Sequence, residues 1–263
     1  MKRRSLLATA ALGCASAIGA LAAYTAAVNL FTGAAAPLPP LQTKEKKKMR
    51  VLILGASGMV GGEVLRACLA SENIEHITAI VRRPLDSAHA KLSQPIHSDF
   101  QNFSALDLSG FDACLYCIGA YTGTLGAAEY ERVICGIPAA LAPELRRQSP
   151  NIVLCHLSGA GADSTEQSTT AFTRLFGKTE NYLKSLHFAR LHIFRPGYIY
   201  PVHARKEPHA AYTLMRWLYK PFLSHMKNSA TTSTQLARAM LGVALAAGGK
   251  EIYENIDIEK YVG

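Results

Sequence analysis

Three glycines at three-residue spacing, Gly55, Gly58 and Gly61, carry the clearest chemical meaning in this sequence. They follow a short apolar run and precede apolar residues at helical spacing, which predicts strand, tight turn and helix. In such a unit the glycines permit the turn, the approach of a pyrophosphate and close helix packing, while amides at the helix N-terminus hold the negative charge. This indicates a dinucleotide site. We expect it to include the turn, the helix start and the end of a later strand (Gly55, Ser57, Gly58, Met59, Val60, Gly61, Ile118 and Gly119).

Two arginines follow the second expected strand, at the place where a dinucleotide's ribose is usually recognised. An acidic residue there would bind a free 2′-hydroxyl, but this chain has Arg82 and Arg83. Paired guanidinium groups favour a 2′-phosphate, hence NADP(H) over NAD(H), although solvated loop arginines would look the same. Asp99, after the third expected strand, is a candidate either to meet the adenine or to cap local backbone.

The elements that must position these residues alternate between strand and helix. Such alternation predicts an α/β fold, a doubly wound parallel sheet of the Rossmann type covered on both faces. A small C-terminal lobe at residues 198–227 would carry the substrate side. We expect strands at 50–54, 76–81, 95–100, 111–118, 151–157, 190–194 and 251–256, and later helices at 126–147, 169–186 and 235–247.

Residues 1–48 differ in composition from residues 49–263, which we expect to be one NAD(P)-binding domain. No charged residue occurs from Ser5 to Thr43, and residues 5–31 are long and apolar enough to cross a bilayer. The segment fits a membrane anchor, an export signal or a mitochondrial presequence. Met49 could also be the true start, which would make the protein cytoplasmic.

The net charge of +9 does not indicate a nucleic-acid-binding protein. Seven basic side chains lie in residues 1–48 against Glu45 alone, so six of the nine excess charges precede the body. No basic surface motif interleaved with aromatic residues accompanies the remainder.

Cysteine and histidine spacing predicts no metal site. Cys114 and Cys117 lie in an expected strand, where their spacing points them to opposite faces. His156 lies in an apolar strand and is expected in the core, while His203 and His209 have no evident carboxylate partner. The chain also has no Gly-x-Ser-x-Gly, which excludes the hydrolases that depend on that elbow.

Five motifs in order resemble the atypical short-chain dehydrogenase/reductases, in the branch of Tat-interacting-protein-like oxidoreductases. The motifs are LILGASGMVGG, IVRRPL, HLSGAGAD, GKTENYLKSLHF and FRPGYIYP, and the resemblance covers nearly all of residues 49–263. It implies oxidoreductase chemistry with a nicotinamide cofactor. It also implies that Ser158 lies on the catalytic face and that residues 195–197 line the nicotinamide side.

The chain departs from the family at its catalytic pair, a tyrosine that transfers a proton and a lysine that binds the ribose. The family register places Phe172 at the tyrosine position and Phe176 at the lysine position. A register shifted to Lys178 puts Arg174 where the tyrosine belongs. Tyr121 is then the foremost substitute acid, with Tyr198 and Tyr200 as others, and each also fits a packing role.

Two functions therefore remain open. One is an NADP(H)-dependent oxidoreductase or isomerase for an unidentified small molecule, using Ser158 and a displaced tyrosine. The other is a catalytically silent NADP(H)-binding protein, tethered to a membrane through residues 5–31, that regulates or assembles a protein partner.

Overall fold

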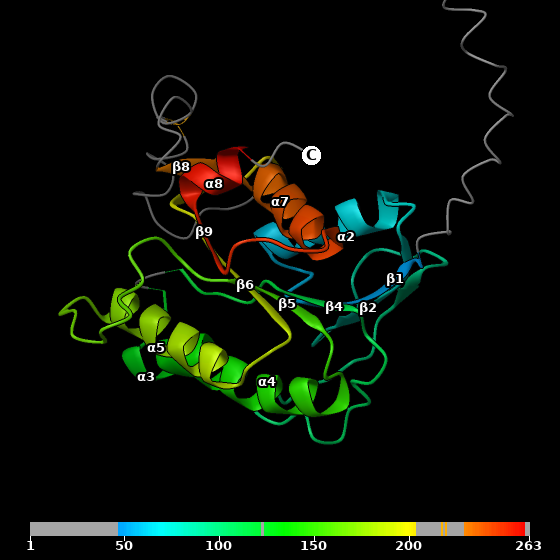
Figure 1. Ribbon diagram of the computed structural model, residues 1–263, viewed down its shortest axis with the longest axis horizontal. Helices are drawn as coiled ribbons and strands as arrows, with labels where there is room; N and C mark the ends of the chain where they lie inside the picture. The colour runs from blue at the N-terminus through cyan, green and yellow to red at the C-terminus, as the bar shows by residue number, and fades with distance from the viewer. Residues whose placement is uncertain (1–46, 122–123, 204–216, 218, 220–228, 261–263) are drawn as a thin grey trace, which may run out of the picture. The chain divides into compact units, whose positions relative to one another are not determined.

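A parallel sheet of seven strands forms the centre of the protein. The computed structural model describes residues 47–121, 124–203, 217, 219 and 229–260. The strand order is β3-β2-β1-β4-β5-β6-β9, and every neighbouring pair runs parallel (Figure 1). This confirms the predicted doubly wound α/β fold. The strands are β1 (Met49–Leu54), β2 (Ile74–Ile80), β3 (Leu92–Ser93), β4 (Ala113–Tyr116), β5 (Val153–Leu157), β6 (Arg190–Arg195) and β9 (Ile252–Glu254).

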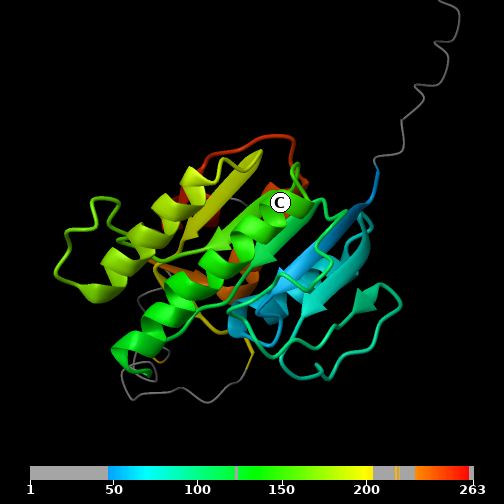
Figure 2. The same ribbon diagram turned by 90° about the horizontal axis from the view of Figure 1, so that it is seen from below.

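Helices cover both faces of the sheet, as Figures 1 and 2 show. On one face lie α2 (Met59–Ala70) and α7 (Ser233–Leu245). On the other lie α3 (Ala127–Glu131), the π-helical turn η1 (Arg132–Gly136), α4 (Ile137–Gln148) and α5 (Ala171–Ser185). Because both faces are covered, the central strands contain continuous buried runs rather than alternating ones; all of Val51–Leu54 and of Ala113–Tyr116 is buried.

Several boundaries differ from those expected. The third strand was predicted at 95–100, but β3 is Leu92–Ser93, and only one isolated bridge joins Val81 to Ile96. The backbone turns after that bridge because the Asp99 carboxylate accepts the amide of Gln101. The last strand ends two residues early, where α8 (Asn255–Lys260) begins.

A second, two-stranded parallel sheet pairs β7 (Tyr198–Tyr200) with β8 (Ala230–Thr232). Of the predicted C-terminal lobe, residues 198–227, the structure describes β7 and residues 201–203, 217 and 219, and β8 lies beyond it in the chain. The predicted N-terminal membrane or signal segment, residues 5–31, also lies outside them. In the part of the chain that the structure describes, none of the helices has the length and apolar character needed to span a bilayer.

Candidate functional site

The glycine turn between β1 and α2 has the geometry that the sequence predicts. Gly55 has φ +83°, and a Cβ there would lie 2.7 Å from the carbonyl carbon of Cys117. A Cβ at Gly61 would lie 2.0 Å from the carbonyl oxygen of Gly55, because the helix packs directly on the turn. The Gly58 amide closes the turn by donating to that same oxygen at 2.8 Å. Side chains at the first and third glycines are thus sterically excluded.

The N-terminus of α2 is open to a negatively charged ligand. Its N-cap, Gly58, makes no side-chain capping hydrogen bond, and the first helical turn contains no acidic residue. Ser57 and Gly58 are both exposed. Backbone amides in this position, aligned with the helix dipole, suit a phosphate group.

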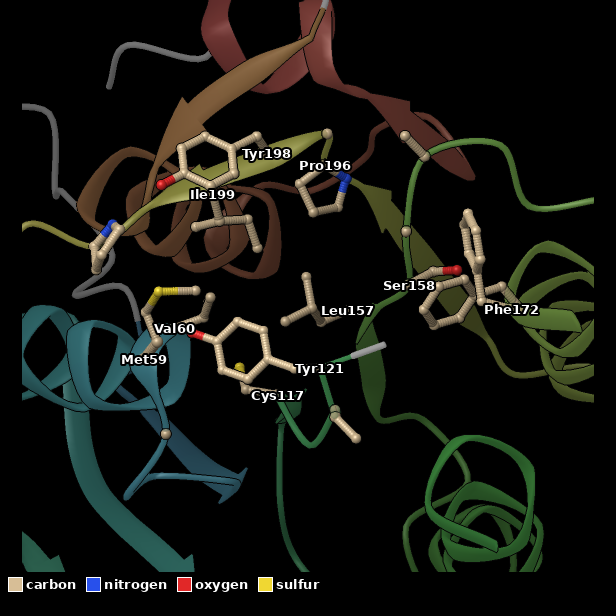
Figure 3. A pocket seen from close by; sticks show the side chains of 18 of the residues that line it. Met59, Val60, Cys117, Tyr121, Leu157, Ser158, Phe172, Pro196, Tyr198 and Ile199 are labelled. Carbon is tan, nitrogen blue, oxygen red and sulfur yellow. The ribbon is translucent and has the colours of Figure 1, made fainter. Parts of the chain in front are cut away.

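A cavity of about 540 Å³ opens beside this turn, at the carboxyl ends of β1, β4, β5 and β6 (Figure 3). In a doubly wound sheet this edge is where ligands bind. No described residue that lines it carries a formal charge. The lining consists of Gly58, Met59, Val60, Cys117, Gly119, Ala120, Tyr121, Tyr130, Leu157, Ser158, Gly159, Ala160, Phe172, Phe176, Pro196, Gly197, Tyr198, Ile199 and Pro201.

The other predicted cofactor residues lie around the same edge. Gly119 lines the cavity, and the Ile118 amide lies 2.9 Å from where a Gly55 Cβ would be. Arg82 and Arg83 follow β2 and are both exposed. Asp99 has the capping role that the sequence left open, since its Oδ1 accepts the Gln101 amide at 2.9 Å. A contact between Asp99 and adenine stays a prediction.

Ser158 reaches the cavity with its hydroxyl already bonded. It is 7% exposed, and its Oγ donates to Oε1 of Glu180 at 2.6 Å. Glu180 is fully buried and also accepts from the Arg195 guanidinium, with Nε 2.9 Å from Oε1. This hydrogen bond raises the pKa of Arg195. A further bond, from Nη1 of Arg195 to Glu254 at 3.0 Å, extends the network to the strand β9.

Both phenylalanines at the family's catalytic positions line the cavity. Phe172 and Phe176 meet edge to face, with ring centroids 6.3 Å apart. The ring of Phe176 packs so closely on Gly159 that a Cβ there would lie 2.6 Å from it. In the alternative register, Lys178 is exposed and pairs with Glu131 at 2.9 Å, and it is not among the cavity-lining residues.

The substitute tyrosines are divided between the cavity and its rim. Tyr121 and Tyr198 line the cavity, and in Figure 3 the ring of Tyr121 extends toward Met59 and Val60. Tyr200 instead stacks on Tyr219, with ring centroids 4.1 Å apart. Packing therefore accounts for Tyr200, while Tyr121 and Tyr198 keep positions from which they could contact a ligand.

His156 is a core residue, as its apolar strand predicted. It is 4% exposed and stacks on Tyr116 at 5.0 Å. Burial lowers the pKa of His156 to about 3, so the ring is neutral near pH 7.

This buried histidine should make the protein less stable in mild acid. The unfolded chain binds the proton near pH 6.5 and the folded chain only near pH 3, so stability falls as pH drops through that interval. When the pH falls from 7 to 5, we expect the free energy of unfolding of His156→Phe to decrease by roughly 2 kcal/mol less than that of the wild type. Urea unfolding at both pH values measures this. The exposed-site control His89→Gln should follow the wild type, and equal losses in all three proteins would contradict the assignment.

Cys68, Cys114, Cys117 and Cys155 are buried free thiols, and Cys135 is partly buried. Burial raises the pKa of Cys114 and of Cys117 well above the usual range. Within the described ranges there is no group of three or more His, Cys, Asp or Glu side chains that could hold a metal ion.

Sequence reasoning missed two acidic residues. His203 was expected to have no carboxylate partner, but its Nε2 lies 3.2 Å from Oε1 of Glu63, which is brought there by α2. His209 lies outside the described residues. Glu180 lies in the motif GKTENYLKSLHF. Its position three residues after Gly177 was visible, but nothing in the sequence pairs it with Ser158 or Arg195.

Comparison with known proteins supports the family resemblance. No family model matches the chain. Protein HTATIP2 of Rattus norvegicus is 29% identical over 230 residues, covering 82% of this chain and 91% of that protein. The mitochondrial protein FMP52 of Candida albicans is 28% identical over 180 residues, covering 64% and 76%.

Solved structures share the fold at low sequence identity. The Bordetella bronchiseptica enzyme WbmH, in complex with NAD+, superposes with a TM-score of 0.58 at 14% identity, over 78% of this chain and 74% of that one. SP1627 of Streptococcus pneumoniae, a putative NADH-flavin reductase, gives 0.52 at 15% identity, over 74% and 92%. Relatives and fold together confirm the resemblance to the atypical branch of the short-chain dehydrogenase/reductases.

Proposed function

We propose that this chain, an atypical short-chain dehydrogenase/reductase-like protein by its relatives and fold, binds a nicotinamide dinucleotide and prefers NADP(H) to NAD(H). The observation that carries the proposal is the glycine cradle. Side chains are excluded at Gly55 and Gly61, and α2 begins there without a capping side chain. A fluorescence titration tests this directly: NADPH should bind the purified protein and change the fluorescence of the nicotinamide.

The residues around the crevice fit the parts of such a cofactor. The Gly55–Gly61 turn, with Ser57, Met59 and Val60, would hold the pyrophosphate, and Arg82 with Arg83 the 2′-phosphate. Asp99, Ile118 and Gly119 would border the adenosine half. Residues 195–197, at the end of β6, would border the nicotinamide half, and Ser158, just after β5, would face the substrate beside it. When bound, the nicotinamide supplies or accepts a hydride.

We assign the protein to the oxidoreductase class, with a small molecule as substrate. Ser158 and Tyr121 are the proposed site groups, because both line the cavity and both carry a hydroxyl. The second candidate is a catalytically silent NADP(H)-binding protein for regulation or assembly. It is favoured by Phe172 and Phe176, since neither can transfer a proton or bond to a ribose.

Turnover distinguishes these two candidates. Because the tyrosine and lysine positions are phenylalanines, we expect the wild type to bind NADPH but to show negligible reduction of a panel of aldehydes and ketones. General acid catalysis usually contributes about 10²- to 10⁴-fold, and a phenylalanine at position 172 cannot supply this factor. Loss of NADPH absorbance at 340 nm measures it. Robust turnover of simple carbonyl compounds would contradict the silent candidate and show that another acid replaces the tyrosine.

Cofactor choice is tested at the two exposed arginines. Replacing both Arg82 and Arg83 by alanine should weaken NADPH binding by about 1–3 kcal/mol, because charge-assisted bonds to the 2′-phosphate are lost. NADH binding should change little. Calorimetric titration of both cofactors measures this, with Arg238→Ala, an exposed arginine on α7, as the control. An equal loss for both cofactors would remove the 2′-phosphate role.

We also propose that residues 1–48 are a targeting or membrane segment and that residues 49–263 form the cofactor domain. The fungal relatives are named as mitochondrial proteins, which favours a presequence over an export signal or an anchor. Mass spectrometry of the mature protein tests this. A new N-terminus between residues 31 and 49 is expected, and an intact Met1 in purified mitochondria would contradict cleavage.

A further inference from the structure

The hydroxyl hydrogen of Ser158 is already used inside the protein. Ser158 donates it to Oε1 of Glu180 at 2.6 Å. The Glu180 carboxylate is fully buried and receives the Arg195 guanidinium on both oxygens, with Nε 2.9 Å from Oε1 and 3.2 Å from Oε2. A carboxylate bonded in this way only accepts hydrogen bonds, so the shared hydrogen belongs to the serine.

The hydrogen bond to Glu180 determines which hydrogen bonds Ser158 can still form with a ligand. A serine hydroxyl has one hydrogen and two lone pairs. Since the hydrogen is held by a buried carboxylate, in a charge-assisted bond about twice as strong as a neutral one, only the lone pairs of the oxygen are left for a ligand in the cavity that Ser158 lines. It therefore suits an O–H or N–H group of a ligand and does not suit a carbonyl oxygen.

The walls beside Ser158 are apolar and aromatic. Phe176 packs on Gly159, the next residue along the chain, and Phe172 meets Phe176 edge to face. Figure 3 shows Phe172 and Ser158 on the same side of the cavity, opposite Met59 and Val60. No described lining residue carries a charge that could pair with a charged ligand. Burying an unpaired carboxylate or ammonium here would be strongly unfavourable.

We infer that the Ser158 end of the cavity binds an uncharged ring compound bearing a hydroxyl or N–H group. The ring lies against Phe172 and Phe176, and Ser158 accepts the ligand's hydrogen bond. The inference rests on the proposed function in one respect, that this end of the crevice holds substrate while the dinucleotide occupies the glycine turn.

Three naphthalene compounds test the two requirements separately in the full-length protein. 2-Naphthol is neutral and has a donor, 2-methoxynaphthalene is neutral without one, and 2-naphthoate is charged. By calorimetry we expect 2-naphthol to bind about 3- to 10-fold more tightly than the methyl ether, the usual value of one hydrogen bond. 2-Naphthoate should bind more than about 100-fold more weakly than 2-naphthol. Equal binding of naphthol and ether, or tighter binding of the naphthoate, would overturn the inference.

Variants assign the preference to Ser158. Ser158→Ala should bring the ratio of the naphthol and ether affinities close to one. Ser185→Ala, which removes a hydroxyl at the far end of α5 that donates to Tyr182, should leave the ratio unchanged. If Ser158→Ala does not fold, the ratio of the naphthol and ether affinities in the wild type still tests the inference. A ratio retained in folded Ser158→Ala would overturn the assignment.

Repeating the titrations with saturating NADP+ separates this inference from the proposed function. Undiminished naphthol binding in the presence of bound cofactor supports both. Naphthol binding in a protein that does not bind NADP+ supports the ring site while the proposed cofactor function fails. Displacement of naphthol by NADP+ would overturn the inference, because the cofactor's own carboxamide would then occupy Ser158.

Discussion

Replacing Gly61 with alanine should destabilise the folded protein by at least about 3 kcal/mol and abolish NADPH binding. The added Cβ would lie 2.0 Å from the Gly55 carbonyl oxygen and 2.6 Å from its carbon. Both atoms are backbone, so neither can rotate away as a side chain would. Helix α2 would have to move off the turn, and its free amides would leave the position that a pyrophosphate requires. Urea unfolding and calorimetric titration measure the two losses.

The neighbouring residue is a matched control. A Cβ at Gly62 would lie 3.5 Å from the Ala56 oxygen, an ordinary contact, and its next neighbours belong to the flexible side chain of Arg66. Alanine inside a helix is favoured over glycine by about 0.5–1 kcal/mol, so Gly62→Ala should be neutral or stabilising and should keep NADPH binding. If the two variants behave alike, close packing of α2 on the turn is not what the third glycine provides.

The second large effect is expected at Glu180. Removing one partner of a buried ion pair leaves the other charge uncompensated, and we expect Glu180→Ala to cost about 3–5 kcal/mol. Arg195 is only 12% exposed at its side chain, so water cannot readily replace the lost carboxylate. Ser158 would also lose the acceptor of its hydroxyl. The free energy of unfolding in urea measures the total.

Glu254 provides the comparison, because it binds the same guanidinium at the rim. Its side chain is 49% exposed, and exposed ion pairs contribute about 0–1 kcal/mol. Glu254→Ala should therefore lower the free energy of unfolding by less than about 1 kcal/mol. A loss at Glu254 as large as that at Glu180 would show that burial does not determine the strength of this network.

The sequence predicted the features that depend on local spacing. The glycine turn was readable because its residues are close together in the chain, and the parallel sheet was readable because local patterns show strands alternating with helices. The resemblance to the family placed Phe172 and Phe176 in the catalytic register, and the structure places both in the cavity wall.

Features formed by residues distant in sequence were not predictable in this way. Ser158, Glu180 and Arg195 come from three elements, and only the sheet register and the packing of α5 bring them together. The contact between His203 and Glu63 was not predictable for the same reason. The two residues are 140 positions apart in the chain, and only the folded position of α2 brings Glu63 to His203. The third strand was misplaced at residues 95–100, where the backbone instead follows the Asp99 turn and Phe100 packs edge to face on Phe103.

The account depends above all on dinucleotide binding at the glycine turn, and titration of NADPH into the full-length wild-type protein tests it most directly. We expect saturable binding of one NADPH per chain, weaker binding of NADH, and no detectable binding to Gly61→Ala. If the folded wild type releases no heat and shows no change in nicotinamide fluorescence with either cofactor, the central claim is wrong.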